Sequence, residues 1–208
     1  MAKTKALPCK RPYELGKRLE QSDRKRAAIL TAARRHLESS GIVELTMDAL
    51  ARESGVTRQT VHNLLGTKSG VLEALFDQLA LDAGMERMRI VMQQSDPEAM
   101  LRGFVEVFTD FWAKDRLLIR RIHGIAAIDP EFGSAVEARN RRRQMAATRI
   151  VERIAGESET RKEKIAALWA LTSFEFFDAV AEGCGTTKDA AGIVFDLVRR
   201  TVIPQTIT

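Results

Sequence analysis

The sequence predicts an all-α protein of about nine helices. Apolar residues recur at helical spacing along most of the chain, and no stretch alternates apolar and polar residues as a half-buried strand would. Capping residues, glycines and prolines divide these segments at short intervals. We therefore expect a basic flexible arm over residues 1–21, a three-helix domain over residues 22–67 and a larger helical domain over residues 68–208.

Charge is unevenly distributed along the 208 residues. Residues 1–72 contain 14 Lys and Arg against 7 Asp and Glu, whereas the other 136 residues contain 19 against 21. A basic segment attached to a near-neutral body indicates a polyanionic partner, either nucleic acid or an anionic membrane surface. For the arm itself, contact with the backbone or minor groove of DNA and a solvated tail both stay open.

Cysteine usage and hydropathy indicate a cytoplasmic protein. Cys9 and Cys184 lie at opposite ends of the chain, and neither has a Cys or His beside it at metal-ligand spacing. We expect a reduced chain without a metal or cofactor. The N-terminal residues lack the apolar stretch of a signal peptide, and no run approaches the roughly 18 apolar residues of a membrane span.

The first predicted helix begins near residue 22. Its apolar residues Leu30, Ala33 and Leu37 follow one another at helical spacing, and Gly41 suits the left-handed position that ends a helix. This helix is expected to pack against the two shorter ones that follow it.

Two short helices follow, separated by a glycine. Thr46 is the expected cap of the first, which stops at Gly55, and Thr57 is the expected cap of the second. Steps of 100° per residue place Val61 and Leu65 on one side of the second helix. Its other side presents Arg58, Gln59, His62 and Asn63. This arrangement is a helix-turn-helix pattern, whose second helix enters the major groove of DNA.

The rest of the chain is also predicted to be helical, with capping residues and Asp-Pro pairs at the helix starts. The first of these helices begins at Thr67. The others are expected to cover residues 97–112, 115–127, 130–155, 160–182 and 187–203.

The N-terminal domain contains the segment GIVELTMDALARESGVTRQTVHNLLGTKSGVLEAL. Its distinctive positions are Gly41, Thr46, Leu50-Ala51, Gly55-Val56, Thr57, Thr60, Gly66-Thr67-Lys68 and Val71-Leu72. Over about 50 residues this set resembles the DNA-binding domain of the TetR family of bacterial transcriptional regulators. The chain departs from the family in having Leu37 and Leu65 where Phe is usual, and His62 where Tyr commonly contacts phosphate.

Eight side chains are candidates for contact with DNA. Gln59 and Asn63 can each form paired hydrogen bonds with adenine, and Arg58 can do so with guanine. Lys68, in the first turn of the next helix, suits a phosphate. A solvated polar face is the simpler interpretation of an isolated helix, but the capped helix-turn-helix favours DNA contact. The complete set is Thr46, Thr57, Arg58, Gln59, Thr60, His62, Asn63 and Lys68.

The last two predicted helices are apolar around most of their surface, so each must be covered on more than one side. The resemblance implies that they pair with those of a second copy in a four-helix bundle. A two-fold homodimer of this kind would bind a palindromic operator in double-stranded DNA. The interface candidates are Phe174, Val180, Val194, Leu197 and Val198.

The larger domain is also rich in aromatic and Met residues, which suit a pocket for a small apolar or aromatic effector. Ordinary core is the alternative for each residue, and the resemblance favours a pocket. The candidates are Phe104, Phe108, Phe111, Trp112, Ile122, His123, Met145, Trp169 and Phe177. A basic cluster on the long helix is interpreted as a solvated face; its members are Arg139, Arg141, Arg142 and Arg143.

No residue pattern indicates an enzyme. His36, His62 and His123 lie on separate elements, and there is no Ser/His/Asp set, metal-ligand cluster or phosphate-binding glycine loop. We expect a sequence-specific transcriptional regulator, a homodimeric repressor released from DNA by a small molecule. The alternatives are a ligand-independent DNA-binding protein or activator of the same fold, and a helical scaffold or membrane-surface protein.

Overall fold

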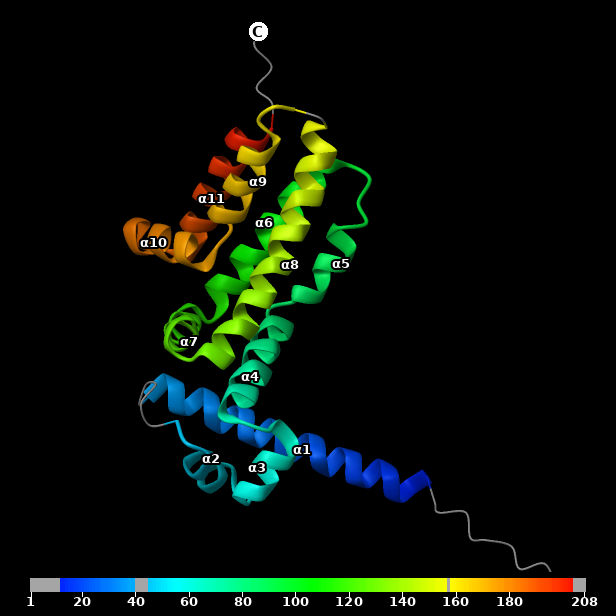
Figure 1. Cartoon of the computed structure of the whole chain (residues 1–208), viewed down its shortest axis with the longest axis vertical. Coiled ribbons are helices and arrows are strands. Elements are labelled where there is room, and N and C mark those ends of the chain that lie inside the picture. Colours follow the sequence, from blue (N-terminus) through cyan, green and yellow to red (C-terminus); the bar gives the residue numbers. More distant parts are fainter. Residues whose placement is uncertain (1–11, 40–44, 157, 204–208) are drawn as a thin grey trace, which may run out of the picture. The chain divides into compact units, whose positions relative to one another are not determined.

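The structure is a computed structural model that describes residues 12–39, 45–156 and 158–203. These residues form eleven α-helices and one 3₁₀ helix, with no strand among them (Figure 1). The predicted all-α class is confirmed. The chain divides into two compact units, Met1–Val71 and Leu72–Thr208.

The first unit contains three helices and the start of a fourth. Helices α1 (Pro12–Ser39), α2 (Met47–Ser54) and α3 (Arg58–Leu65) pack against one another. Helix α4 (Lys68–Asp82) begins in this unit and continues into the second. Apolar residues of all three packed helices are buried, including Ile29, Leu37, Leu50, Val61 and Leu65.

Threonine caps begin the two short helices where the sequence predicted them. The hydroxyl oxygen of Thr46 accepts a hydrogen bond from the backbone N–H of Ala49 at 3.1 Å, and that of Thr57 accepts one from Thr60 at 3.1 Å. Between the helices Gly55 has a φ of 68°, a left-handed conformation that favours glycine. Residues 55–57 alone therefore connect α2 to α3.

Helix α1 is longer than predicted, which corrects the proposed arm. Residues 1–21 were expected to be flexible, but the helix begins at Pro12. Proline is favoured in the first turn of a helix because its missing N–H needs no partner there, and no other proline follows within α1. Residues 1–11 and Gly41, the predicted end of the helix, lie outside the described residues.

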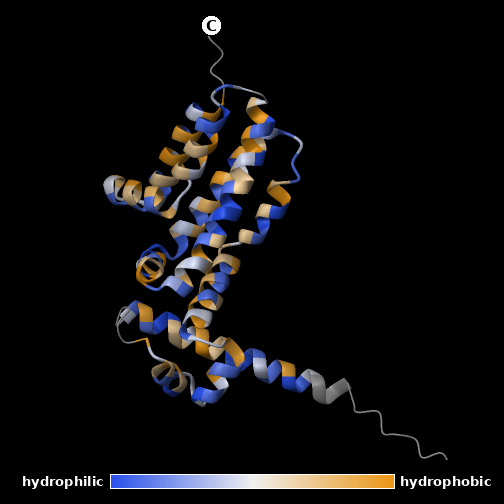
Figure 2. Cartoon of the chain, in the orientation of Figure 1, coloured by the Kyte–Doolittle hydropathy of each residue, from blue (hydrophilic) through white to orange (hydrophobic). Residues whose placement is uncertain are grey.

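The second unit is a bundle of mostly longer helices. Helix α8 packs against α7 and α9, and α11 packs against α6, α9 and α10 (Figure 1). Each helix carries both hydrophobic and hydrophilic residues, as expected of amphipathic helices (Figure 2). The elements are η1 (Met85–Arg87), α5 (Met88–Val91), α6 (Pro97–Lys114), α7 (Arg116–Ile128), α8 (Pro130–Ala155), α9 (Arg161–Leu171), α10 (Phe174–Cys184) and α11 (Thr187–Val202).

Two Asp-Pro pairs begin helices of this unit as predicted. A carboxylate oxygen of Asp96 accepts a hydrogen bond from the backbone N–H of Glu98 at 3.0 Å, at the start of α6. A carboxylate oxygen of Asp129 accepts one from Phe132 at 3.1 Å, at the start of α8. Each proline occupies the first helical position, where its missing N–H costs nothing.

The single helix predicted over residues 160–182 is in fact two helices, α9 and α10. The hydroxyl of Thr172 donates a hydrogen bond to the carbonyl of Leu168 at 2.7 Å, and the hydroxyl oxygen of Ser173 accepts one from the N–H of Phe176 at 3.2 Å. Those contacts end one helix and cap the next. The apolar character on all sides of the segment therefore belongs to two helices with different directions.

A core substitution tests the packing of the second unit. Phe177 of α10 has no exposed surface, so replacing it with Ala removes a fully buried ring. We expect the free energy of unfolding to fall by about 3–5 kcal/mol, measured by chemical denaturation followed by circular dichroism. The neighbouring half-buried Phe176 gives the matched control, Phe176→Ala, with a clearly smaller loss. Equal losses would contradict the placement of Phe177 in the core.

Candidate DNA interface and ligand cavity

The polar side of α3 is exposed, as predicted. The side chains of Arg58, Gln59, His62 and Asn63 all face solvent, while Val61 is fully buried. Helix α3 is therefore held in the first unit by its apolar side and presents its amide-rich side outward. Its eight residues would present about two turns to a DNA groove.

Hydrogen bonds within the protein order this face. The side-chain amide of Gln59 donates to the carbonyl oxygen of Asn63 at 2.8 Å, and a guanidinium nitrogen of Arg58 lies 3.1 Å from a carboxylate oxygen of Asp48 in α2. The amide pair keeps the carbonyl oxygen of Gln59 and further N–H groups available, which is the donor and acceptor set that adenine requires. The ion pair of Arg58 is exposed and weak, so it can be exchanged for another partner.

The remaining candidates for DNA contact lie near helix starts. Thr46 and Thr57 are exposed caps, and the hydroxyl of Thr57 also lies 2.8 Å from that of Thr60. Lys68 is the first residue of α4, and the hydroxyl oxygen of Thr67 accepts a backbone hydrogen bond there at 3.2 Å. Helix starts carry partial positive charge, so these positions suit phosphate contacts.

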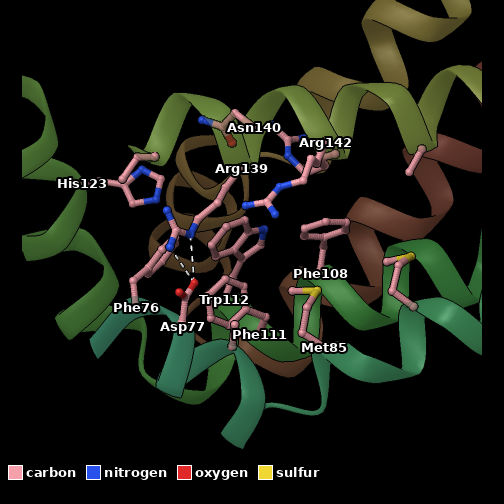
Figure 3. Close-up of a pocket in the computed structure, with 15 residues that line it drawn as sticks. Phe76, Asp77, Met85, Phe108, Phe111, Trp112, His123, Arg139, Asn140 and Arg142 are labelled. Atoms are coloured by element: carbon pink, nitrogen blue, oxygen red, sulfur yellow. Dashed lines mark hydrogen bonds and ion pairs between the residues drawn. The ribbon is translucent and has the colours of Figure 1, made fainter. Parts of the chain in front are cut away.

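The second unit contains a cavity of about 340 Å³ whose lining comes mainly from α4, α6, α7 and α8 (Figure 3). Four aromatic rings and His123 line it. The rings of Phe111 and Trp112 lie 4.6 Å apart between centroids, and the ring of His123 stands perpendicular to that of Trp112 at 5.9 Å. The other aromatic lining residues are Phe76 and Phe108. This part of the cavity is suited to a flat apolar group.

The nine predicted effector residues divide into two groups. Four line this cavity: Phe108, Phe111, Trp112 and His123. Five do not line it: Phe104, Ile122 and Phe177 are fully buried in the core, and Met145 and Trp169 are 58% and 36% exposed. Sequence periodicity cannot separate a cavity wall from the core behind it, because both are apolar.

Helix α8 forms the basic wall of the cavity, opposite the rings of α6 (Figure 3). This corrects the interpretation of the arginine cluster as a solvated face. Arg143 is only 5% exposed, and Arg139 and Arg142 also line the cavity. Arg141 and Arg142 are exposed, as the solvated-face interpretation requires, and Arg141 pairs with Glu137 one turn away.

The burial of Arg143 could have been recognised from spacing. The buried positions of α8 are Phe132, Val136, Arg143, Ala147, Ile150 and Val151. They follow one another at intervals that keep them on one helix face. An arginine on an otherwise apolar face of a helix indicates a charge directed into the protein. This signal was missed because Arg143 was grouped with the three other arginines of the cluster.

Arg143 is charged and incompletely paired. Its guanidinium donates to the carbonyl of Trp169 and, at 3.0 Å, to the hydroxyl of Thr172. Its Nε is buried without a partner. Desolvation lowers the pKa of Arg143 to about 10, which still leaves the side chain charged at neutral pH.

His123 joins the cavity to α10. Its Nδ1 lies 2.8 Å from a carboxylate oxygen of Glu175, and the hydrogen bond from His123 lowers the pKa of Glu175 to about 2. The other ring nitrogen, Nε2, is buried without a partner. Two residues that line the cavity, His123 and Arg143, therefore each have a buried nitrogen atom with unused hydrogen-bonding capacity.

An ion-pair cluster also links α7 to α10. Asp178 accepts hydrogen bonds from Arg116 at 2.6 Å and from Arg120 at 2.8 Å, and Glu182 pairs with both arginines. Burial alone raises the pKa of Asp178, but the hydrogen bonds from Arg120 and Arg116 hold it below its ordinary value. This cluster stabilises the packing of α10 on α7.

Three of the five predicted dimer contacts are corrected by the structure. Phe174, Val194 and Val198 are buried within the protomer itself, so their side chains are not available to a second copy. Leu197 remains 36% exposed and Val180 is half-buried. Apolar character was the basis of the prediction, and it does not distinguish the protomer core from a surface that a partner would cover.

Within the described ranges, no group of three or more His, Cys, Asp and Glu residues is arranged to hold a metal ion. None of the helices described has the length and apolar character required to cross a membrane. Together, the capped helix pair, its exposed amide face and the helical unit that follows define a helix-turn-helix DNA-binding protein.

Comparison with known proteins finds a family match in the N-terminal part of the chain. Residues 29–75 match the family model described as bacterial regulatory proteins, tetR family. None of the curated proteins compared with the chain matches it. The resemblance seen in the sequence is confirmed for these residues, which match the N-terminal DNA-binding domain of that family.

Solved structures of several regulators share the fold over most of the chain. NalD, the secondary repressor of the MexAB-OprM multidrug efflux pump in Pseudomonas aeruginosa, is 21% identical, with a TM-score of 0.67 over 89% of this chain and 99% of that one. A TetR transcription regulator from Haloarcula marismortui is 17% identical, with a TM-score of 0.65 over 86% and 96%. PfmR, a TetR-family regulator from Thermus thermophilus, is 19% identical, with a TM-score of 0.60 over 83% and 97%.

The ion-pair cluster predicts a loss of stability in acid. Because the pKa of Asp178 is lower in the folded chain than in the unfolded chain, its contribution is complete above about pH 4 and is lost as pH falls further. We expect Asp178→Asn to lower the thermal midpoint at pH 7 and to reduce its further decline between pH 5 and pH 2. Asp196→Asn, at an exposed position of α11, is the control. An unchanged acid profile in Asp178→Asn would contradict this role.

Proposed function

We propose that the protein is a sequence-specific transcriptional regulator that binds a palindromic operator as a homodimer and is released by a small molecule. The observation that carries this proposal is the exposed amide face of α3, held outward by the burial of Val61. A helix of this kind, following a short capped helix, matches the geometry that reads the major groove. The protein would act in the cytoplasm, as a repressor in its ligand-free form.

The dimer is supported by exposed apolar residues on α11. Ile193 and Leu197 are 40% and 36% exposed and lie one turn apart, and α10, which packs against α11, carries the half-buried Val180. A second copy would cover such a surface, and a two-fold axis between the copies would present two recognition helices to two half-sites. NalD, which shares the fold, is a repressor, and this likeness supports the proposed direction of regulation.

The effector role is supported by the cavity of the second unit. Its volume of about 340 Å³ falls within the range typical of small-molecule sites. A ligand there would release DNA by binding more tightly to a domain arrangement in which the two recognition helices no longer fit one operator.

Selection of the purified protein on a random pool of duplex DNA at near-physiological salt tests the proposal. An enriched palindrome with two half-sites is expected, because a dimer reads the same sequence twice. Retention of DNA without sequence preference, with easy removal by salt, would overturn the specific regulator in favour of charge-driven binding. Equal binding to anionic vesicles would favour a membrane-surface protein.

Substitutions on α3 should relax base preference. Gln59→Ala and Asn63→Ala are each expected to cost about 1–3 kcal/mol at the affected base pair, measured by competition between single-base operator variants. Because the two side chains share a hydrogen bond, the double variant should lose less than the sum of the single losses. The control is Gln78→Ala, which removes an exposed amide bonded to Asp82 in α4. Unchanged base preference in both α3 variants would exclude them as readers.

Lys68 should position the protein on DNA without reading sequence. Lys68→Ala is expected to weaken binding to all duplexes by a similar factor and to reduce the slope of log affinity against log salt by about 0.9, the value for one phosphate contact. Measurements on the selected operator and on an unrelated duplex over a range of salt concentrations test this. A loss confined to the operator would instead assign Lys68 a role in base recognition.

A further inference from the structure

The cavity of the second unit contains a buried cation without a counter-ion. Arg143 is 5% exposed and donates only to uncharged oxygen atoms, those of Trp169 and Thr172. The carboxylate that acts on it from a greater distance, Glu175, is already hydrogen-bonded to His123. A buried charge with incomplete pairing costs folding free energy, and a protein retains one where it has a use for it.

The lining as a whole carries excess positive charge. Its three arginines face one carboxylate, that of Asp77, which pairs with Arg139 at 2.6 Å. Arg139 also lies 3.6 Å from Glu73, so its charge is compensated by α4. Arg142 makes no hydrogen bond or ion pair with the described residues. Two arginines without a carboxylate partner among the described residues thus line the cavity: Arg143, which is buried, and Arg142, which is exposed to solvent.

The opposite wall of the cavity is apolar and aromatic. The rings of Phe108, Phe111 and Trp112 point from α6 toward the arginines of α8 (Figure 3). Such a cavity contacts an aromatic body through its rings and an acidic group through its arginines. A neutral apolar molecule would leave the buried guanidinium of Arg143 without a counter-ion.

We propose that the effector is an organic anion with an aromatic body, such as an aryl carboxylate, whose acidic group pairs with Arg143 and Arg142 while its ring packs on Trp112. This inference specifies the ligand of the proposed regulator and rests on the assignment of the cavity as its effector site. It adds a negative charge to the small apolar or aromatic effector expected from the sequence. Arg143 lines the cavity, and its planar guanidinium suits the two oxygen atoms of a carboxylate.

The position of Arg143 also connects the ligand to the end of α9. The same guanidinium that would bind the anion donates to the carbonyl of Trp169 and the hydroxyl of Thr172, where α9 stops and α10 begins. An anion that draws the guanidinium toward the cavity therefore changes the hydrogen bonds of that junction. Helices α9 and α10 both pack against α11, which carries the proposed dimer surface, so the junction is in contact with the helix of that surface.

Matched pairs of ligands on the full-length protein test the charge preference. The probes are 2-naphthoate and 2-naphthamide, with benzoate and benzamide as a smaller pair, measured by isothermal titration calorimetry at about pH 7.5, where the acids are ionised and Arg143 keeps its charge. Within a pair the ring is the same and only the charge differs. At least one acid is expected to bind about tenfold or more tightly than its amide, as a charge-assisted hydrogen bond provides.

Variants of α8 assign the preference to its arginines. Arg143→Met should remove most of the difference between acid and amide, and Arg142→Met should reduce it. The matched control is Arg141→Met, which removes an exposed arginine of the same helix outside the cavity lining and should retain the difference. Because Arg143 also holds the end of α9, its variant is checked by thermal unfolding. If it does not fold, Arg142→Met decides the result.

The outcomes separate the anion site from the regulatory role. Equal affinity for acid and amide in both pairs, including undetectable binding of both up to millimolar concentration, would overturn the inference. A preference that survives in Arg142→Met and in folded Arg143→Met would also overturn it. Release of the selected operator is measured in parallel with the same probes. Acid binding without DNA release supports the anion site and refutes the effector role, whereas release by acid and amide alike refutes the anion site and retains that role.

Discussion

In α3 the side chain of Val61 is fully buried, and its burial determines which side of the helix faces outward. If the helix rotated by one residue position, the amides of Gln59 and Asn63 would turn toward the core and apolar residues would turn toward solvent. The same constraint applies in α8, where Phe132 and Ile150 are buried and orient the helix so that Arg143 faces inward. Apolar contacts thereby position the polar groups that both proposed sites require.

Most of the first unit could be predicted from the sequence, because its signals are local. Thr46 and Thr57 cap their helices through backbone groups three residues away, and Gly55 supplies the left-handed turn between them. The Asp-Pro starts of α6 and α8 are local in the same sense. Signals of this kind need no knowledge of tertiary packing, so their positions agreed with the structure.

The sequence-based predictions were wrong where the environment of a residue depends on segments far from it in the chain. Phe177 and Phe108 are both apolar, and only the fold shows that the first is core while the second borders a cavity. Arg143 is buried against α9, where it donates a hydrogen bond to Trp169, a residue 26 positions later in the sequence. The division at Thr172 was missed because a continuous apolar composition conceals a change in helix direction. Likewise, Val194 and Leu197 share a helix and apolar character, but only the second is exposed.

The hydrogen bond between Gln59 and Asn63 has a consequence for the entropy of DNA recognition. Both side chains are long enough to populate several rotamers, and their mutual bond restricts them while the helix is still free in solution. Docking then immobilises side chains that are already partly ordered, so less conformational freedom is lost on association. The exposed face of α3 is therefore partly preorganised, because a hydrogen bond across one helical turn restricts both amides before DNA binds.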